Sequence, residues 1–361
     1  MKLKGIVETN FGFAEAKLCF GEYKGNDCVQ ISFPVLGDMN NETKNAVITE
    51  TTVDCVFEIN EMPTDIHIEK EDGKWQGFID VKAIEYKYSL EITYVAEEPE
   101  FGEHTFVIPE ENVRKLNEHN DFTNEACEGI MKYELNNPEV LSYVKGMGID
   151  VENHHDFATI CALMKKTSEI IHHDGVHYNH DSENIGTIAQ IKHAEKQGNY
   201  TNCRGISIIL AGVLRAYGFV ANVVECWPAK SDDMEIHVVC EVYAEDDDKY
   251  VLLDVSNNLI YFRDGKPLSL VELREAITKG ETDKLTANED FSHNGNAVSL
   301  MELFAYMSKN VMCFRKSILS DETHEMDNEN SIALVSKDLL DLDYPKSTLY
   351  TCNVQEFYTV K

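Results

Sequence analysis

Three residues in the second half of the chain have the types and the order that nucleophilic catalysis needs. His237 follows Cys203 by 34 residues, and Asp254 follows the histidine by 17. A cysteine thiolate attacks a carbonyl carbon, an imidazole protonates the leaving group, and a carboxylate holds the imidazole in the right tautomer. The order therefore predicts a Cys–His–Asp triad, provided that the fold brings the three side chains together.

The segment that begins at Cys203 predicts a buried helix. Almost every residue from 206 to 214 is apolar or small, as in a helix covered on all sides, and Gly218 occupies the usual position after a helix end. Asn202 is a good N-cap residue, so Cys203 would lie in the first turn. There the helix dipole and the neighbouring Arg204 favour the thiolate. The alternative is a buried structural cysteine at a helix start.

His237 and Asp254 fall in two segments that predict a β-hairpin, separated by the polar turn AEDDDK. If Tyr243 pairs with Tyr250, Asp254 lies diagonally across from His237 on the same face of the hairpin. A slip of one residue would separate the two side chains. A histidine on an apolar strand is also typical of a core residue whose hydrogen bonds are satisfied, so this alternative stays open.

Residues 155–262 are similar to the transglutaminase-like superfamily, a branch of the papain-like cysteine enzymes. The similarity rests on four segments in the superfamily's order: IIHHDGVHY, NCRGISIILAGVLRAYGFVANVV, IHVVCEVY and KYVLLDVSNN. It implies a papain-like α+β domain in which a buried helix carries the cysteine against an antiparallel sheet. It also implies acyl transfer through a thioester on Cys203, with His237 as acid/base, Asp254 orienting it, and no cofactor.

The resemblance further implies an oxyanion hole and a substrate pocket. The backbone N–H of Cys203 would be one oxyanion donor, and a nearby side chain would be the second. The candidates for that second donor are Gln197, Asn199 and Asn202, and no feature of the sequence selects one of them. Arg204 and Trp227 are further candidates for the pocket, although Trp227 is also typical of an ordinary core aromatic.

Three positions depart from the superfamily pattern. Thr201 stands where glycine is frequent, Arg204 where a small residue is frequent, and Val238 where an aromatic residue is frequent. Because none of these changes removes a triad residue, they indicate a divergent member with an altered acyl or leaving-group pocket. Arg215 matches the superfamily's helix-end arginine, and we expect it to bind carbonyls or a buried acid.

A dense histidine segment precedes the nucleophile. His172, His173, His177 and His180 lie within nine residues, a density that can bind zinc. However, no separate group of cysteine and histidine ligands accompanies them, and the segment matches the superfamily's helix-to-turn region. We therefore expect no metal and place these histidines at the edge of a substrate cleft, with a metalloenzyme as the alternative.

The distribution of strand and helix signals predicts three parts of the chain. Residues 1–108 carry β-branched and aromatic segments between turn signals, which is typical of an antiparallel sheet or sandwich, here of unknown role. Residues 109–318 would hold a helical lead-in and the catalytic core. Residues 319–361 would form an acidic loop and a C-terminal extension packing on that core, with a strand at 349–360. Helices are predicted at 109–118, 122–135, 138–147, 156–171, 183–197, 268–277 and 299–310.

The composition limits the partners. The 361 residues carry 32 Lys and Arg against 64 Asp and Glu, a net charge of −32, which disfavours nucleic acid and anionic membrane surfaces. No apolar run is long enough to span a membrane, and the opening residues do not resemble a secretory signal. The ten cysteines include no CxxC pair and lie in apolar contexts, so we expect buried thiols in a reducing, cytoplasmic location.

Together these features predict a cysteine peptidase or amidase that acts on a peptide, a protein or a small amide. Water is the favoured acyl acceptor, because amine transfer needs a site that excludes water. The alternatives are a transglutaminase-type amine acyltransferase and a non-catalytic binding or scaffold protein with the same fold. The sequence predicts no oligomeric state.

Overall fold

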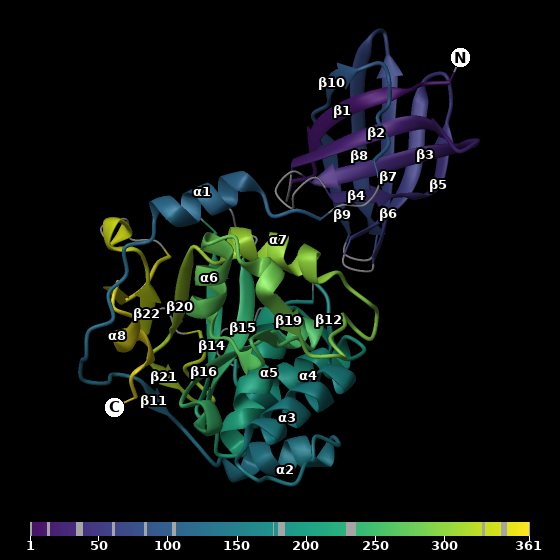
Figure 1. The fold of residues 1–361 in the computed structure, drawn as a ribbon. Helices are drawn as coiled ribbons and strands as arrows, with labels where there is room; N and C mark the ends of the chain where they lie inside the picture. Colours follow the sequence, from purple (N-terminus) through teal and green to yellow (C-terminus); the bar gives the residue numbers. More distant parts are fainter. Residues whose placement is uncertain are drawn as a thin grey trace. The chain divides into compact units, whose positions relative to one another are not determined.

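The computed structural model divides the chain into two compact units, Met1–Pro109 and Glu110–Lys361 (Figure 1). Both helices and strands are present, and this confirms the α+β class that the sequence predicts. No described helix is long and apolar enough to cross a membrane. The structure describes residues 2–12, 15–33, 39–59, 62–82, 85–102, 106–175, 177–179, 185–228, 236–326, 329–340 and 345–360.

The first unit is built from two five-stranded antiparallel sheets. One sheet has the strand order β10-β1-β2-β3-β4, and the other has the order β5-β6-β7-β8-β9. The strands are β1 Gly5–Asn10, β2 Glu15–Tyr23, β3 Asn26–Phe33, β4 Met39–Glu42, β5 Lys44–Ile48, β6 Thr52–Ile59, β7 Met62–Glu71, β8 Lys74–Val81, β9 Tyr86–Leu90 and β10 Thr93–Ala96.

The two sheets share one apolar core, which makes this unit a β-sandwich. Leu18 and Phe20 from the first sheet pack in the same cluster as Ile66 and Ile68 from the second. The last two strands of the unit follow each other closely in the sequence, yet β9 belongs to one sheet and β10 to the other. The chain therefore crosses between the sheets at residues 91–92.

A six-stranded sheet forms the centre of the second unit. Its order is β16-β15-β14-β20-β22-β23, and all neighbours are antiparallel except β22 and β23. Tyr243 pairs with Tyr250, which confirms the predicted register of the hairpin. The strands are β14 Ala221–Trp227, β15 His237–Ala244, β16 Lys249–Leu253, β20 Cys313–Ser317, β22 Ser331–Leu334 and β23 Leu349–Thr351.

Helix α5, Cys203–Ala216, is buried in the middle of this unit. Every residue from Gly205 to Ala216 is buried, and the helix packs on β14 and β15 as well as on α2, α3 and α4 (Figure 1). Gly212 allows a close approach of α4, because a Cβ there would lie 1.7 Å from Oγ1 of Thr187. Contacts all around the helix thus explain why its sequence is apolar on every face.

The remaining helices and short strands surround this core. The helices are α1 Glu110–Glu118, α2 Pro138–Gly146, α3 Phe157–Ile170, α4 Thr187–Lys196, α6 Leu270–Thr278, α7 Leu300–Asn310 and α8 Val354–Tyr358. Three small sheets join β11 Lys132–Tyr133 with β21 Leu319–Ser320, β12 His172–His173 with β13 Tyr200–Thr201, and β17 Tyr261–Arg263 with β18 Lys266–Pro267 and β19 Leu285–Ala287. The β12–β13 pair leads directly into α5.

The predicted helix at 122–135 is wrong. This stretch is largely irregular and extended, with β11 near its end. Its backbone N–H groups bond to residues far along the chain, since Thr123 donates to the carbonyl of Cys352 at 2.8 Å and Lys132 to that of Ile318 at 2.9 Å. These long-range hydrogen bonds replace the i→i−4 bonds that a helix would need.

The C-terminal residues are part of the second unit and contribute strands to it. The part predicted as an acidic loop and extension, 319–361, contains β21 and β22, and β22 joins the central sheet. The tail 349–360, predicted as a strand, forms β23 and then turns into α8. Residues 319–361 therefore complete the sheet against which α5 packs.

Candidate active site

Cys203 is the first residue of α5 and is partly exposed. Asn202 caps the helix, because its Oδ1 accepts the N–H of Gly205 at 3.0 Å. A side chain in this first turn lies beside backbone N–H groups that have no partner within the helix, at the positive end of the helix dipole. The local structure therefore favours a negative charge on the sulfur.

His237 stands between this thiol and a carboxylate. It is the first residue of β15 and is 3% exposed. Its imidazole is within hydrogen-bonding reach of the Cys203 thiol. Its Nε2 lies 3.2 Å from Oδ2 of the buried Asp254, which forms an ion pair with it. The structure thus brings the three predicted triad residues together in the expected order.

A tight turn after β16 holds Asp254 in place. The backbone N–H and C=O of Asp254 both bond to Leu259, at 3.0 and 2.9 Å. Asn257 donates its side-chain amide to Oδ2 of Asp254 at 2.9 Å. The turn closes through Asn258, whose φ of 44° lies in the left-handed region that asparagine tolerates. Backbone and side-chain bonds together aim the carboxylate at His237.

The three groups shift one another's pKa values. Burial disfavours the Cys203 thiolate, but hydrogen bonds from His173 and His237 outweigh burial and lower the pKa of the thiol to about 6. Burial also disfavours a charged His237, yet the adjacent Asp254 raises the pKa of the imidazole to about 10. Although burial opposes it, the charge on His237 lowers the pKa of Asp254. These shifts favour a thiolate–imidazolium pair beside a carboxylate.

A second histidine contacts the same sulfur. His173, in β12, is within hydrogen-bonding reach of the Cys203 thiol. Its Nδ1 lies 2.9 Å from Nε2 of His293. Asn294 accepts the backbone N–H of His173 at 2.9 Å and donates to its carbonyl at 2.7 Å. The thiol therefore lies between two imidazoles, only one of which is paired with Asp254.

The three amides predicted as oxyanion donors are placed differently. Gln197 and Asn199 are exposed residues at the end of α4. Asn202 uses Oδ1 as the helix-cap acceptor, and its backbone N–H donates to the carbonyl of His177 at 3.0 Å. Among the contacts described for these residues, none brings a side-chain N–H to Cys203.

The two pocket candidates flank the triad. The guanidinium of Arg204 donates to the hydroxyl of Tyr178 and lies 5.2 Å from the centroid of that ring. Trp227 is the last residue of β14 and follows Cys226, which pairs with His237. Its Nε1 donates to Glu225 at 3.0 Å. The roles of Arg204 and Trp227 as pocket walls stay predictions.

The histidine segment serves several separate contacts. The ring of His172 lies 5.3 Å from that of Tyr200, and His177 bonds through Nδ1 to Asp174. His180 lies outside the described residues. Within the part of the chain that the structure describes, no three His, Cys, Asp or Glu residues are grouped so that they could hold a metal ion.

Thr201, which stands where the superfamily often has glycine, packs against a glycine in α5. A Cβ at Gly205 would lie 2.1 Å from Oγ1 of Thr201, so only glycine leaves room for the threonine side chain. Thr201 pairs with His173 between β13 and β12, and its Oγ1 donates to the carbonyl of His177 at 3.3 Å. The close fit of Thr201 and Gly205 therefore fixes how β13 packs against the first turn of α5.

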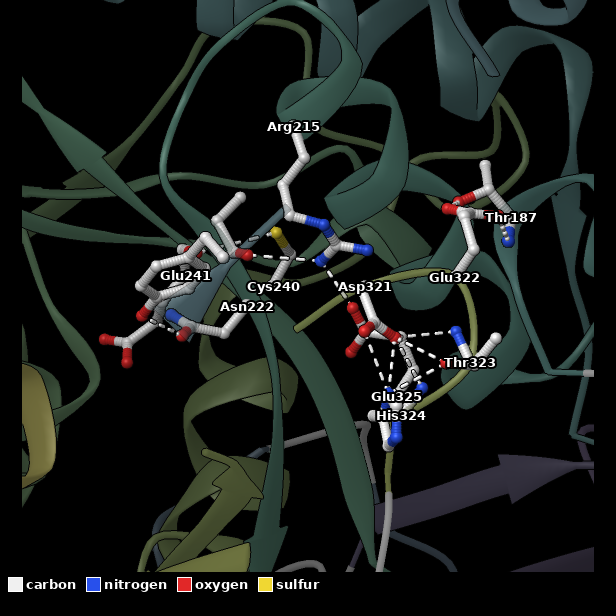
Figure 2. A network of polar contacts seen from close by, with 12 residues as sticks. Thr187, Arg215, Asn222, Cys240, Glu241, Asp321, Glu322, Thr323, His324 and Glu325 are labelled. Carbon is white, nitrogen blue, oxygen red and sulfur yellow. Dashed lines mark hydrogen bonds and ion pairs between the residues drawn. The ribbon is translucent and has the colours of Figure 1, made fainter. Parts of the chain in front are cut away.

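At the other end of α5, Arg215 forms a buried ion pair with Glu325 and donates to the carbonyl of Ala221 at 3.2 Å (Figure 2). Burial raises the pKa of Glu325 to about 7, against the opposing charge of Arg215. In the same segment, Glu322 accepts the backbone N–H of Thr187 at 2.7 Å, at the start of α4. Arg215 thus bonds both a carbonyl and a buried acid, as its position at the helix end predicts.

A cavity of about 320 Å³ adjoins the site. It borders α5, the turn that follows Asp254 and the loop that holds His173, and its lining includes His172, Ile206, Ser256, Asn258 and Asn294. Ser256 Oγ and Asn258 Oδ1 are buried there, and no described group forms a hydrogen bond with them. The cavity therefore offers polar groups beside the elements that carry Cys203, Asp254 and His173.

Three solved structures are similar to this chain at low identity. A candidate cysteine protease from Cytophaga hutchinsonii is 9% identical with a TM-score of 0.26, and the match covers 79% of this chain and 81% of that one. The periplasmic domain of TgpA from Pseudomonas aeruginosa is 11% identical with a TM-score of 0.24, covering 63% and 77%. A candidate protease from Parabacteroides distasonis is 11% identical with a TM-score of 0.23, covering 54% of this chain but 37% of its own length. No protein-family model and no curated protein matches.

The sequence predicts no specific role at the site for four of its residues. His173 is visible there only as part of the histidine segment, where two histidines in a row are the available signal. His293, Asn294 and Tyr306 carry no local signal, because their contacts depend on the tertiary fold. The ring of Tyr306, in α7, packs edge-on against His237 with 5.3 Å between the centroids.

Proposed function

We propose that this chain is a cysteine-dependent acyl-transfer enzyme that cleaves an amide or peptide bond through a thioester on Cys203. One observation carries the proposal: His237 lies between the Cys203 thiol at a helix start and the buried carboxylate of Asp254. This arrangement fits a divergent, transglutaminase-like cysteine enzyme. The proposal does not depend on the low-identity structural similarities.

In the first half of the reaction the Cys203 thiolate attacks the carbonyl carbon of the substrate. A C–S bond forms, and the carbonyl oxygen takes up the negative charge beside the backbone N–H of Cys203. The imidazolium of His237 then gives its proton to the leaving nitrogen, the C–N bond breaks, and an amine departs. Asp254 keeps the imidazolium oriented and stabilises its charge throughout this step.

In the second half, neutral His237 accepts a proton from water as the water oxygen attacks the thioester. The C–S bond breaks, a carboxylic acid leaves, and Cys203 regains its thiolate paired with the imidazolium. An amine that attacks in place of water gives a new amide and the same free enzyme. Hydrolysis and amine transfer therefore share every protein group and differ only in the acceptor.

A non-catalytic binding protein is the competing interpretation. Such a protein has no need to keep three ionisable groups aligned in a buried site, where desolvation costs free energy. The lowered pKa of Cys203 and the raised pKa of His237 instead match what a thiol nucleophile needs at neutral pH. Both shifts favour the enzymatic interpretation.

The proposal also includes a class of substrate and a cellular location. We expect a peptide, a protein or a small amide, with a neutral or basic group favoured by the net charge of −32. All ten cysteines are free thiols, which suits the reducing environment of the cytoplasm.

Trapping the acyl-enzyme tests the proposal. p-Nitrophenyl acetate should acetylate Cys203 of the wild-type chain within minutes, as followed by intact mass and peptide mapping, and hydroxylamine should remove the acetyl group. Cys203→Ala should remove the adduct. Cys161→Ser is the matched control, because Cys161 is also partly exposed but burial raises the pKa of its thiol to about 11. If Cys203 is acetylated no faster than Cys161, the chain is not an acyl-transfer enzyme.

The same experiment with added glycine ethyl ester decides between the two acceptors. Formation of the N-acetyl product at millimolar amine concentrations would assign amine transfer, whereas release of acetate alone would assign hydrolysis. Peptide and glutamine amides would then be screened as natural acyl donors.

A further inference from the structure

We propose that His173 is the second oxyanion-hole donor of this site, acting together with the backbone N–H of Cys203. This inference rests on the proposed acyl-transfer function and names a residue that this function leaves open. The observation behind it is the juxtaposition of His173 with the Cys203 thiol, on a strand fixed beside the residues that lead into α5.

The backbone around His173 is held rigidly. β12 runs parallel to β13, and His173 is paired there with Thr201, two residues before the nucleophile. The backbone N–H of Asp174 extends this pairing by donating to the carbonyl of Thr201 at 2.9 Å. From the other side, Asn294 bonds both the N–H and the carbonyl of His173. A preorganised donor needs such support, because reorganisation during the reaction would cost transition-state stabilisation.

The side chain of His173 is oriented by a second imidazole. Its Nδ1 and Nε2 of His293 share a hydrogen bond of 2.9 Å, which leaves Nε2 of His173 to face the sulfur. A thiolate has no proton to donate, so Nε2 of His173 must carry a hydrogen and donate it. When the substrate carbonyl becomes an oxyanion bonded to that sulfur, the same N–H can donate to the oxyanion.

His173 differs from His237 in a way that separates their roles. His237 pairs with the Asp254 carboxylate, which stabilises an imidazolium and equips it for proton transfer. His173 pairs with His293, and two imidazoles joined by a hydrogen bond cannot both carry their second proton on the shared side. The His293 contact therefore orients His173 as a donor, whereas His237 has the carboxylate partner that stabilises an imidazolium.

The amides predicted for this role fit it less well. Gln197 and Asn199 are exposed, and Asn202 has its Oδ1 committed to the helix cap. His173 is the described side chain other than His237 that hydrogen-bonds to the Cys203 thiol. The assignment thus follows from which polar groups reach the sulfur.

The test compares two reactions of Cys203 that differ in their need for an oxyanion hole. Acylation by p-nitrophenyl acetate passes through an oxyanion, whereas alkylation by iodoacetamide displaces iodide and forms none. Both reactions need the thiolate. At about pH 9.5 the thiol of a His173 variant stays largely ionised because it keeps its bond to His237, so an effect on acylation alone reports the oxyanion donor. Peptide mapping assigns both adducts to Cys203.

His173→Ala is expected to slow acylation by about 10²-fold at this pH, the cost of removing one oxyanion donor, with alkylation changed less than threefold. His173→Gln keeps an N–H donor and is expected to recover at least a tenth of the wild-type acylation rate. His154→Gln, an exposed histidine of the same unit, is the matched control and is expected to leave both rates unchanged. Far-UV circular dichroism shows whether each variant is folded.

Three results would overturn the assignment. Acylation that returns to the wild-type rate at high pH in His173→Ala would show that His173 only lowers the pKa of the thiol. If both variants are folded and the acylation rate falls equally in His173→Ala and His173→Gln, the lost group transferred a proton and was not an oxyanion hydrogen-bond donor. An unchanged acylation rate at every pH would remove any role in catalysis. If the wild-type chain is alkylated but never acylated at Cys203, the acyl-transfer function itself fails, which is a separate outcome.

Discussion

Nε2 of His237 lies 3.2 Å from Oδ2 of Asp254, with both side chains buried. The last residue pair of the β15–β16 ladder is Cys240 with Leu253, so Asp254 lies just beyond the hairpin proper. The bonds of Asp254 to Leu259 and Asn257, more than strand pairing, hold the carboxylate on the imidazole. This arrangement leads to specific expectations for reactivity and stability.

The alkylation of Cys203 should follow the ionisation of a strongly acidified thiol. Because the pKa of Cys203 is lowered to about 6, the iodoacetamide rate should rise through pH 6 and be near its maximum at pH 7. His237→Ala should move this midpoint upward toward the ordinary thiol value of about 9, since a bond to the thiolate is lost. The measurement is the alkylation rate at each pH, read by peptide mapping.

His67→Ala provides the matched control for that measurement. His67 also contacts an aspartate, with its Nδ1 2.6 Å from Oδ1 of Asp54, but it lies in the first unit. The variant should leave the pH profile of Cys203 unchanged. An unshifted midpoint in His237→Ala would show that the thiol is not paired with this histidine.

Asp254→Asn should disable the histidine while leaving the site assembled. The carboxylate is what raises the pKa of His237 to about 10 against the effect of burial, so its removal should lower that pKa and allow the wrong tautomer. We expect acylation by p-nitrophenyl acetate to fall by about 10²- to 10⁴-fold. Asp54→Asn, at the His67 pair, should have no effect. A loss of less than threefold in Asp254→Asn would contradict a triad.

Gly205→Ala should destabilise the chain and disturb the nucleophile together. The added Cβ would meet Oγ1 of Thr201 at 2.1 Å, and relieving this overlap should cost about 1–3 kcal/mol in the free energy of unfolding. The double variant Gly205→Ala with Thr201→Ala removes the overlapping atom and should regain most of that stability. Urea denaturation of the wild type, the two single variants and the double variant measures the coupling. If Gly205→Ala is as stable as the wild type, the two side chains do not constrain each other.

Glu325 should make stability depend on pH in the neutral range. Its folded-state pKa is raised to about 7 from an ordinary value near 4.5, so between these values the folded chain holds a proton that the unfolded chain has lost. The contribution of Glu325 to the free energy of unfolding is therefore fully present at low pH, and it declines as the pH rises from about 4.5 to 7. Glu325→Gln should flatten this part of the profile in urea denaturation, whereas Glu322→Gln, three residues away, should not.

Arg215→Met supplies the complementary test of the same ion pair. Removing one member of a buried pair leaves the other charge unpaired, and the typical cost is about 3–5 kcal/mol. Because Glu325 can take up a proton, the loss should be smaller at pH 5 than at pH 8. If Arg215→Met lowers the free energy of unfolding equally at pH 5 and pH 8, Glu325 stays neutral in the wild-type chain.

Local patterns made much of the core predictable. The apolar segment after Cys203 predicts α5 because a helix buried on all sides leaves a recognisable run, and the short acidic turn fixes the pairing of Tyr243 with Tyr250. The same patterns place Cys203, His237 and Asp254 where the structure brings them together. The catalytic role of these residues stays a prediction.

Long-range pairing could not be predicted in the same way. The stretch 122–135 has helix-forming residues, yet its backbone bonds to residues near 318 and 352, which no local pattern reveals. His173 reaches Cys203 through a parallel pair of two-residue strands and is oriented by His293, far along the chain. Such contacts depend on the finished tertiary fold.

The order of the central sheet has a consequence for how the chain is made. β14 is paired on one side with β15 and on the other with β20, and the sheet ends in β22 and β23, close to the C-terminus. A ribosome therefore releases α5 and β14 long before the strands that cover the open edge of β14, and before Glu325 can neutralise Arg215. Until then the exposed edge is open to pairing with other chains. Truncated translation products would carry Cys203 without the framework that holds its helix.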